Sequence, residues 1–263
     1  MTLDILICTM ADRLGRIAGM LLPPRSDVRY VVSCQYGYDA PPTCPRELAD
    51  REDVRLVFLE GKGLSRNRNH CLKHAKGDIL LIADDDEKFS NEGISELIRI
   101  YEQDPEVDVA LLKIDGLDKY YPQVAFDFRM KDFRGAYYTT SHEMSMRRTS
   151  IQDLAFDERF GLGSEYLSCG EEQVFICDAL RHRKVVRWFP VVIGSTAPGT
   201  TGERFLEDQG VQRAKGATFC YLFGRGMAWL MCLKESLHYL VYKKVNPIPL
   251  MCHMNDGIRY ITH

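Results

Sequence analysis

The sequence lacks the patterns that mark several common classes of protein. No two of its nine cysteines form a Cys-x-x-Cys pair, and it contains no Gly-Lys-Ser/Thr phosphate loop, no Gly-x-Ser-x-Gly elbow and no internal repeat. Its net charge of −3 provides no basic field that would attract nucleic acid. These absences argue against a disulfide scaffold, a P-loop nucleotidase, an α/β-hydrolase and a nucleic-acid-binding protein.

The cysteines and the start of the chain bear on location. The cysteine count is odd and several cysteines lie in apolar runs, as free buried thiols do, which favours a reducing compartment. The apolar stretch at residues 5–10 is short and no basic segment precedes it, so we expect no secretion signal. A cytoplasmic protein is the expectation, with peripheral attachment to the cytoplasmic face of a membrane left open.

The first half of the chain alternates strand-like and helix-like segments. Its composition, 45% hydrophobic and 27% charged, is that of an ordinary globular protein. We expect strands at residues 4–9, 28–34, 54–59, 78–83 and 107–114, and helices at 14–22, 65–76 and 90–103. This alternation predicts an α/β fold with a mixed, mainly parallel sheet flanked by helices.

The pattern loosens after Gly116, where we expect a strand at 143–147, a helix at 171–181 and one or two strands within 185–193. Residues 196–202 are expected to form a flexible loop. We divide the chain into 1–204, with halves at 1–115 and 116–204, and a C-terminal helical segment at 205–263.

The apolar stretch 217–233 holds a single charge, Arg225, in 17 residues. It is shorter than the roughly 20 residues that span a bilayer. We expect either a buried core helix or a helix lying at a membrane interface, and lysines and aromatic residues further on keep the second reading open.

The acidic run at 84–87, Asp-Asp-Asp-Glu, follows directly after an apolar strand. Two carboxylates about 5 Å apart repel by roughly 3 kcal/mol at an effective dielectric constant of about 20. Ligands of open α/β sheets bind beyond the carboxyl ends of strands, and oxygen ligands favour Mg²⁺ or Mn²⁺. The run therefore predicts a cation site, in preference to a solvated acidic loop.

Two further features carry charge at expected helix starts. The segment 63–69 combines glycine with two arginines, which would suit a phosphate or diphosphate. Glu171 and Glu172 open the helix at 171–181, where they either stabilise its first turn or supply a general base. His70 and His74 have a spacing that zinc sites use, but no nearby Cys or Glu completes a zinc site.

Taken together, the string at 63–87 resembles family 2 glycosyltransferases of the GT-A fold. Their pattern contains a Gly-Leu-Ser start, an Arg-Asn pair, Ala-x-Gly, an apolar strand and Asp-x-Asp, all present here in that order. The stretch 156–161 resembles the approach to the family's acidic base motif. The resemblance covers roughly residues 3–195 and is specific as a combination.

The resemblance implies roles for particular residues. Asp84 and Asp86 would bind the metal, Mn²⁺ or Mg²⁺, with Asp84 also near the ribose. Gln35 stands close to where the family usually places an Asp on the base, so it is expected to read the base instead. The full set of implied donor-binding residues is Thr9, Met10, Asp12, Gln35, Gly63, Arg68, Asn69, Asp84 and Asp85.

The resemblance also implies the reaction. Glu172 matches the usual Asp of the family's Glu-Asp pair and would be the base, with Glu171 second. The implied activity is inverting transfer of a sugar from a nucleotide-diphospho-sugar, expected to be a UDP-sugar, to a hydroxyl of a glycan or lipid-linked acceptor in polysaccharide or cell-surface glycan synthesis. Two alternatives remain: a non-catalytic sugar-nucleotide or carbohydrate-binding protein, and a phosphohydrolase using Asp84 as nucleophile and Asp86 as acid.

Overall fold

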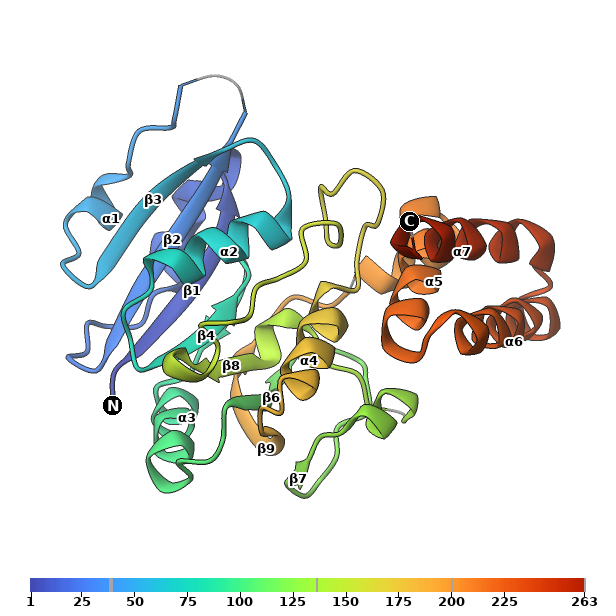
Figure 1. Cartoon of the computed structure of the whole chain (residues 1–263). Helices are drawn as coiled ribbons and strands as arrows, with labels where there is room; N and C mark the ends of the chain where they lie inside the picture. The colour runs from blue at the N-terminus through green and yellow to red at the C-terminus, as the bar shows by residue number, and fades with distance from the viewer. Residues whose placement is uncertain (38–39, 136, 200, 263) are drawn as a thin grey trace. The chain divides into compact units, whose positions relative to one another are not determined.

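The computed structural model describes residues 1–37, 40–135, 137–199 and 201–262. The chain forms two compact units (Figure 1). The sheet unit comprises residues 1–62, 66–156 and 178–198, and the helical unit comprises residues 63–65, 157–177 and 199–263.

The described residues of the sheet unit form one mixed sheet of nine strands. Its order is β3-β2-β1-β4-β8-β6-β9-β5, and β7 pairs with β9 outside this path. The bounds are β1 (Leu3–Met10), β2 (Val28–Tyr36), β3 (Val54–Glu60), β4 (Ile79–Ala83), β5 (Lys88–Phe89), β6 (Val109–Asp115), β7 (Phe126–Asp127), β8 (Met144–Arg147) and β9 (Val186–Ser195).

Two parallel pairings and one antiparallel pairing position the strand ends that form the site. β1 lies between β2 and β4 and runs parallel to both, so the carboxyl ends of the three strands meet at one edge. β8 runs antiparallel to β4, with Leu81 opposite Ser145. The residues that precede β8 therefore lie at the same edge as the residues that follow β4.

Helices cover both faces of this sheet. Alternate residues of β1, among them Leu3, Ile5 and Ile7, join a core with the helices η1 and α3. On the other face the Cys71 thiol contacts the carbonyl oxygen of Ile7. The bounds in the first half of the chain are η1 (Ala11–Met20), α1 (Arg46–Ala49), α2 (Leu64–His74) and α3 (Asn91–Gln103).

Later elements are shorter or belong to the C-terminal part. Their bounds are η2 (Met130–Arg134), η3 (Ser141–Glu143), η4 (Arg148–Ser150), α4 (Glu171–Arg181), η5 (Thr201–Leu206), α5 (Gln209–Phe223), α6 (Arg225–Lys243) and α7 (Pro247–Thr262). Contacts join α5, α6 and α7 pairwise within the helical unit.

The predicted strands and the helices at 65–76, 90–103 and 171–181 are confirmed within a few residues, and the mixed α/β fold class is confirmed with them. The expected helix at 14–22 is a 3₁₀ helix instead. The expected loop at 196–202 ends inside η5. The dividing line at residue 204 stays a prediction.

The expectation of one helix through 217–233 is wrong. The chain breaks at Gly224, whose φ of +78° belongs to the left-handed half of conformational space that glycine tolerates. Gly224 thereby ends α5 and precedes α6. The apolar residues of the stretch are divided between two helices and need not share one face.

Two glycines let α5 and α7 approach closely. A Cβ atom on Gly216 would lie 1.9 Å from the Met254 carbonyl oxygen, and one on Gly257 would lie 1.8 Å from the Arg213 carbonyl oxygen. Both distances are far below van der Waals contact, and both neighbours are backbone atoms that cannot rotate away. The contact between α5 and α7 therefore requires glycine on each helix.

We predict that Gly257→Ala lowers the free energy of unfolding by about 1–3 kcal/mol, because the methyl group forces the two helices apart. Urea unfolding followed by circular dichroism measures the change. Gly226→Ala in α6 is the matched control, since nothing lies within 4 Å of its Cβ position, and it should change the stability by less than about 1 kcal/mol. Equal effects of the two substitutions would contradict the prediction.

Candidate functional site at the carboxyl edge of the sheet

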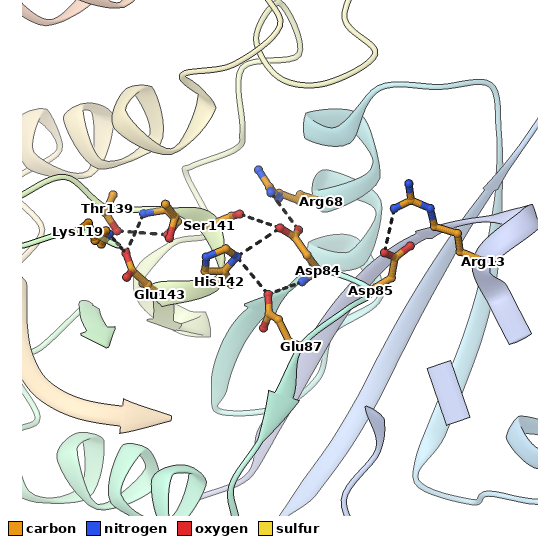
Figure 2. A network of polar contacts seen from close by, with 11 residues as sticks. Arg13, Arg68, Asp84, Asp85, Glu87, Lys119, Thr139, Ser141, His142 and Glu143 are labelled. Carbon is orange, nitrogen blue, oxygen red and sulfur yellow. Dashed lines mark hydrogen bonds and ion pairs between the residues drawn. The ribbon is translucent and has the colours of Figure 1, made fainter. Parts of the chain in front are cut away.

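Asp84 follows β4 directly and is the centre of a polar network (Figure 2). Its carboxylate accepts a hydrogen bond from Arg68 Nη2 at 3.3 Å and one from Ser141 Oγ at 3.4 Å. His142 Nδ1 lies 3.4 Å from the same carboxylate. Burial opposes ionisation of Asp84, but the His142 hydrogen bond and the Arg68 charge hold its pKa below the ordinary value. Asp84 is therefore a carboxylate at neutral pH.

Arg68 is held in place on both sides of its guanidinium group. The side chain is 1% exposed, and the guanidinium carbon lies 5.5 Å from the centre of the Phe156 ring. A desolvated cation on an aromatic face keeps one orientation. Arg68 therefore presents a fixed positive charge to Asp84.

His142 joins Asp84 to Glu87. His142 Nδ1 lies 3.3 Å from Glu87 Oε1, and the same oxygen accepts a hydrogen bond from the Asp84 backbone N–H at 2.8 Å. Burial opposes the charge of His142, yet its hydrogen bonds to Asp84 and Glu87 raise its pKa to about 10. Burial raises the pKa of Glu87 to about 7. An imidazolium here provides positive charge that the buried carboxylates need.

The same three side chains could hold a metal ion. One ligand atom each from Asp84, Glu87 and His142 lies within 4.8 Å of the other two. Two of their atoms, Glu87 Oε2 and His142 Nε2, are buried with no hydrogen-bond partner among the described residues. Two carboxylates and an imidazole suit Mn²⁺ better than Mg²⁺, which prefers oxygen ligands alone. The residues present fit a divalent cation.

Asp85 and Asp86 differ in their burial and in their hydrogen bonds. Asp85 is 8% exposed and accepts hydrogen bonds from Thr9 Oγ1 at 2.8 Å and Arg13 Nη1 at 3.2 Å. Asp86 is exposed, and no hydrogen bond or ion pair reaches it from the part of the chain that the structure describes. Partial burial of its carboxyl group and the charges of Asp84 and Asp85 raise its pKa. Asp86 is the carboxylate of the run best placed to take an external cation.

A buried ion pair lies beside His142. Lys119 Nζ and Glu143 Oε2 are 2.5 Å apart, and the two side chains are 1% and 0% exposed (Figure 2). Glu143 also accepts hydrogen bonds from the Tyr121 hydroxyl at 2.5 Å and from the Thr140 backbone N–H at 2.9 Å. These bonds anchor η3, the short helix that carries His142.

The ends of β1 and β2 are tied together by a residue that our site prediction did not include. Asn67 Nδ2 donates to the carbonyl oxygens of Ser33 at 3.2 Å and Thr9 at 3.4 Å. Gln35, near the end of β2, is 2% exposed, and its amide nitrogen has no hydrogen-bond partner among the described residues. Met10 and Asp12 are exposed nearby in the sequence.

Asn69 has a structural role, because its side chain makes two hydrogen bonds to the Phe156 backbone. Its amide nitrogen donates to the Phe156 carbonyl oxygen at 2.9 Å, and its amide oxygen accepts from the Phe156 N–H at 2.8 Å. This pair of bonds fixes the chain at Phe156, whose ring supports Arg68. Asn69 therefore acts on the site through Phe156, and its predicted contact with a donor stays a prediction.

Three predicted site residues belong to the helical unit. Gly63 has a φ of +118°, in the range that favours glycine, and precedes α2. Glu171 and Glu172 form the first turn of α4; Glu171 is 4% exposed and Glu172 is partly exposed. The sheet unit thus brings together Thr9, Arg68 and the run 84–87, and the two glutamates belong to the helical unit.

Sequence reasoning missed His142, Ser141, Glu143, Lys119 and Arg13, and assigned no role to Glu87. His142 is 58 positions from Asp84 along the chain. Nothing in its local sequence distinguishes it from any other histidine. The available signal was the strand expected at 143–147: residues just before a strand that pairs antiparallel with β4 must lie near Asp84.

Comparison with known proteins gives a family match over part of the chain. Residues 43–157 match the model of the glycosyl transferase family 2. A search of curated proteins gives no match.

Solved structures share the fold at low sequence identity. TarS residues 1–349 from S. aureus in complex with UDP is 17% identical, with a TM-score of 0.57 over 92% of this chain and 72% of that one. The complex of the same protein with UDP-GlcNAc is 14% identical, with a TM-score of 0.56 over 99% and 90%. The mannosyltransferase PcManGT from Pyrobaculum calidifontis, with GDP-Man and Mn²⁺, is 13% identical, with a TM-score of 0.54 over 99% and 74%.

The mixed sheet flanked by helices is thus the GT-A fold that these solved structures share. The chain carries a family 2 segment at 43–157, which confirms the resemblance seen in the sequence and the prediction of an enzyme. Neither the non-catalytic binding protein nor the phosphohydrolase finds support in these matches.

We predict that the metal-free protein loses stability as the pH rises from 6.5 to about 10. The pKa of His142 is raised from 6.5 to about 10 and that of Glu87 from 4.5 to about 7, so the folded state binds more protons than the unfolded state. The His142 contribution is complete below pH 6.5 and is lost as the pH approaches 10.

Urea unfolding in EDTA at several pH values checks this prediction. His142→Gln should be less stable than the original protein at pH 6.5 and should show a flatter profile up to pH 10. His182→Gln is the control, because His182 pairs with Asp153 at the surface. Parallel profiles for the original protein and His142→Gln would refute the assignment.

Proposed function

We propose that this enzyme transfers a sugar, with inversion, from a nucleotide-diphospho-sugar to a hydroxyl of a glycan or lipid-linked acceptor. The observation that carries the proposal is the exposed carboxylate of Asp86, unpaired among the described residues, near the partly buried carboxylate of Asp84 at the carboxyl edge of the sheet. Related folds hold UDP, UDP-GlcNAc or GDP-Man. We expect a UDP-sugar as donor and a role in polysaccharide or cell-surface glycan synthesis.

The proposed metal is Mn²⁺ or Mg²⁺, held by Asp84 and Asp86. Glu87 and His142 are further candidate ligands, and the imidazole favours Mn²⁺. When bound, the ion supplies positive charge that stabilises a leaving diphosphate. The chain's own fixed positive charge at this edge is Arg68, which is already ordered by Asp84 and Phe156 and needs no rearrangement to act.

The proposed donor-binding residues lie mainly in the half 1–115, and the half 116–204 is proposed to shape the acceptor site. Thr9 and Arg13 fix Asp85 by hydrogen bonds, which keeps the turn after β4 in one conformation. The complete proposed donor set is Thr9, Met10, Asp12, Gln35, Gly63, Arg68, Asn69, Asp84 and Asp85.

The proposed base is Glu172, with Glu171 as the second candidate. Glu172 takes the proton of the acceptor hydroxyl while that oxygen bonds to the anomeric carbon, and the bond from this carbon to the diphosphate oxygen breaks. The nucleoside diphosphate leaves with the bonding electron pair. Both glutamates lie in the first turn of α4, where the helix dipole favours negative charge, and a general base acts in its charged form.

We also propose a cytoplasmic location with peripheral membrane contact through the C-terminal segment. Among the described residues, no helix is both long and apolar enough to cross a membrane. A peripheral contact would suit a lipid-linked acceptor, which presents its sugar at the membrane surface.

The donor screen is the first test. With Mn²⁺ present, one class among UDP-, GDP- and dTDP-sugars should raise the melting temperature and release nucleotide slowly, because water can replace the acceptor. Thermal shift and nucleotide release measure the two effects. A protein that shifts with none of these donors, with or without Mn²⁺, would contradict the proposal.

Asp86→Asn should weaken donor binding in Mn²⁺ by roughly tenfold to a hundredfold, since removing even a supporting group from a metal site costs that much. Binding of donor in EDTA should be unchanged. Glu106→Gln is the control, because Glu106 is an exposed carboxylate of the same unit. A normal response of Asp86→Asn to Mn²⁺ would show that the metal binds elsewhere.

Glu172→Gln should lower sugar transfer by roughly 10²–10⁴-fold, the usual contribution of a general base, and leave donor affinity nearly unchanged. Glu172→Asp keeps the carboxylate and should retain most activity, and Glu165→Gln is an exposed control in the same unit. Near-normal turnover in Glu172→Gln would reject the assignment and direct attention to Glu171.

A further inference from the structure

The helix α6 has an apolar face that no described residue of the helical unit covers. Its inward side carries the small buried residues Ala228, Cys232 and Ser236, at intervals of four. An adjacent side carries six exposed large apolar residues, Trp229, Leu230, Leu233, Leu237, Leu240 and Val241. Leu230 is 56% exposed and Val241 is 57% exposed.

These six positions form a continuous stripe. At about 100° per residue they fall within an arc of roughly 120°, whose centre lies about 120° around the helix from the centre of the buried side. The stripe runs along most of the 19 residues of α6. A contiguous apolar surface of this kind on a water-soluble unit marks an interaction site.

The charges beside the stripe are almost all positive. Arg225, Lys234, Lys243 and Lys244 are exposed in and just after α6. The one acidic residue of α6, Glu235, is neutralised by Lys215, whose Nζ lies 3.1 Å from its carboxylate. The stripe therefore has Lys234 along one edge, and the other three cations lie at the two ends of α6.

A hollow next to the first turn of α6 has the same mixed character. It measures about 650 Å³ and is lined by Arg225, Gly226, Trp229, Leu230, Asn255 and Ile258. It combines a cation with aromatic and aliphatic side chains. An anionic lipid offers matching chemistry, because its charged headgroup adjoins a hydrocarbon chain.

We propose that the outer face of α6 docks on an anionic lipid bilayer, with the stripe in the interfacial layer and the four cations against lipid headgroups. Apolar residues flanked by Lys and Arg are the composition of interfacial helices, and each cation near an anionic surface adds to the affinity. Trp229, and the 71% exposed Tyr242 near the end of the helix, are the residue types that favour the membrane interface.

A second copy of the chain matches this face less well. A two-fold pairing of α6 with itself in antiparallel orientation would bring the cations of opposite ends together, Arg225 with Lys243. Glu235, the acid of α6, is already paired with Lys215 and cannot offset them. Like charges facing each other oppose such a dimer, whereas an anionic bilayer attracts all four cations.

The inference rests on the proposed membrane contact and names its surface and lipid class, but it does not depend on the proposed reaction. Co-sedimentation of the full chain with vesicles tests it, using phosphatidylcholine alone and phosphatidylcholine with roughly 30% phosphatidylglycerol. We expect at least roughly tenfold stronger binding to the anionic vesicles, and loss of that preference in high salt.

Two double variants separate the apolar and the charge contributions. Leu233→Gln with Leu237→Gln should weaken binding to anionic vesicles by roughly tenfold or more. Lys234→Gln with Lys243→Gln should remove most of the preference for anionic over neutral vesicles. The control, Val124→Gln with Leu206→Gln, alters two exposed apolar residues outside α6 and should bind as the original protein does.

Folding and donor binding are read separately, by circular dichroism and by the donor-induced thermal shift, and both should be unchanged in all three double variants. If the protein binds vesicles but no donor shifts its melting temperature, the transferase proposal is contradicted and the membrane proposal is not. Unchanged vesicle binding of the Leu233→Gln, Leu237→Gln variant would overturn the membrane proposal. The proposal would also be overturned if the original protein does not bind vesicles but forms a stable dimer, and the leucine variant is a monomer.

Discussion

The structure of the sheet unit depends on how four consecutive acidic residues are neutralised at the carboxyl edge of a sheet. The run 84–87 follows the fully buried β4, so its first members cannot all turn to solvent. Neutralisation is divided among three cations from separate elements: Arg68, Arg13 and His142. Only the Asp86 carboxylate remains exposed and unpaired within the described chain, and this asymmetry makes the turn a candidate cation site rather than a salt-bridged surface loop.

The buried Lys119–Glu143 ion pair supports this arrangement by holding η3, the helix that carries His142. Removing both charges from water is costly, and the cost is offset only by close geometry and additional hydrogen bonds. Glu143 receives such bonds from Tyr121 and from the backbone at Thr140, and Lys119 lies 5.0 Å from the Tyr121 ring centre. Since His142 and Glu143 are adjacent in η3, the pair fixes the backbone from which the imidazole reaches the acidic run.

In the helical unit, the packing depends on close contact between the backbones of two helices. Gly216 and Gly257 allow α5 and α7 to touch, and the small residues of α6 contact this pair. The inward side of α6 needs little apolar area, yet the helix carries large apolar residues on its outer side. These exposed apolar residues contribute little to the stability of the unit, because they are not buried in it. We therefore assign this face of α6 to an external partner.

The sequence by itself determined the local features. Apolar runs with β-branched residues predict the strands because burial on both faces demands them, and the acidic run was found because its charges are adjacent in the chain. The run was predicted as a cation site on that basis, and the family resemblance implied Asp84 and Asp86 as the metal ligands. The structure places Asp84 in a partly buried network and Asp86 at the surface.

Tertiary structure alone decided which distant groups meet. His142 reaches Asp84 across 58 positions because β8 runs antiparallel to β4, and pairing between strands is not encoded in any short window of sequence. The break at Gly224 was missed because an apolar stretch looks the same whether it forms one helix or two. Which face of α6 stays uncovered depends on the packing of its neighbours, since helical periodicity alone shows apolar residues on nearly every side.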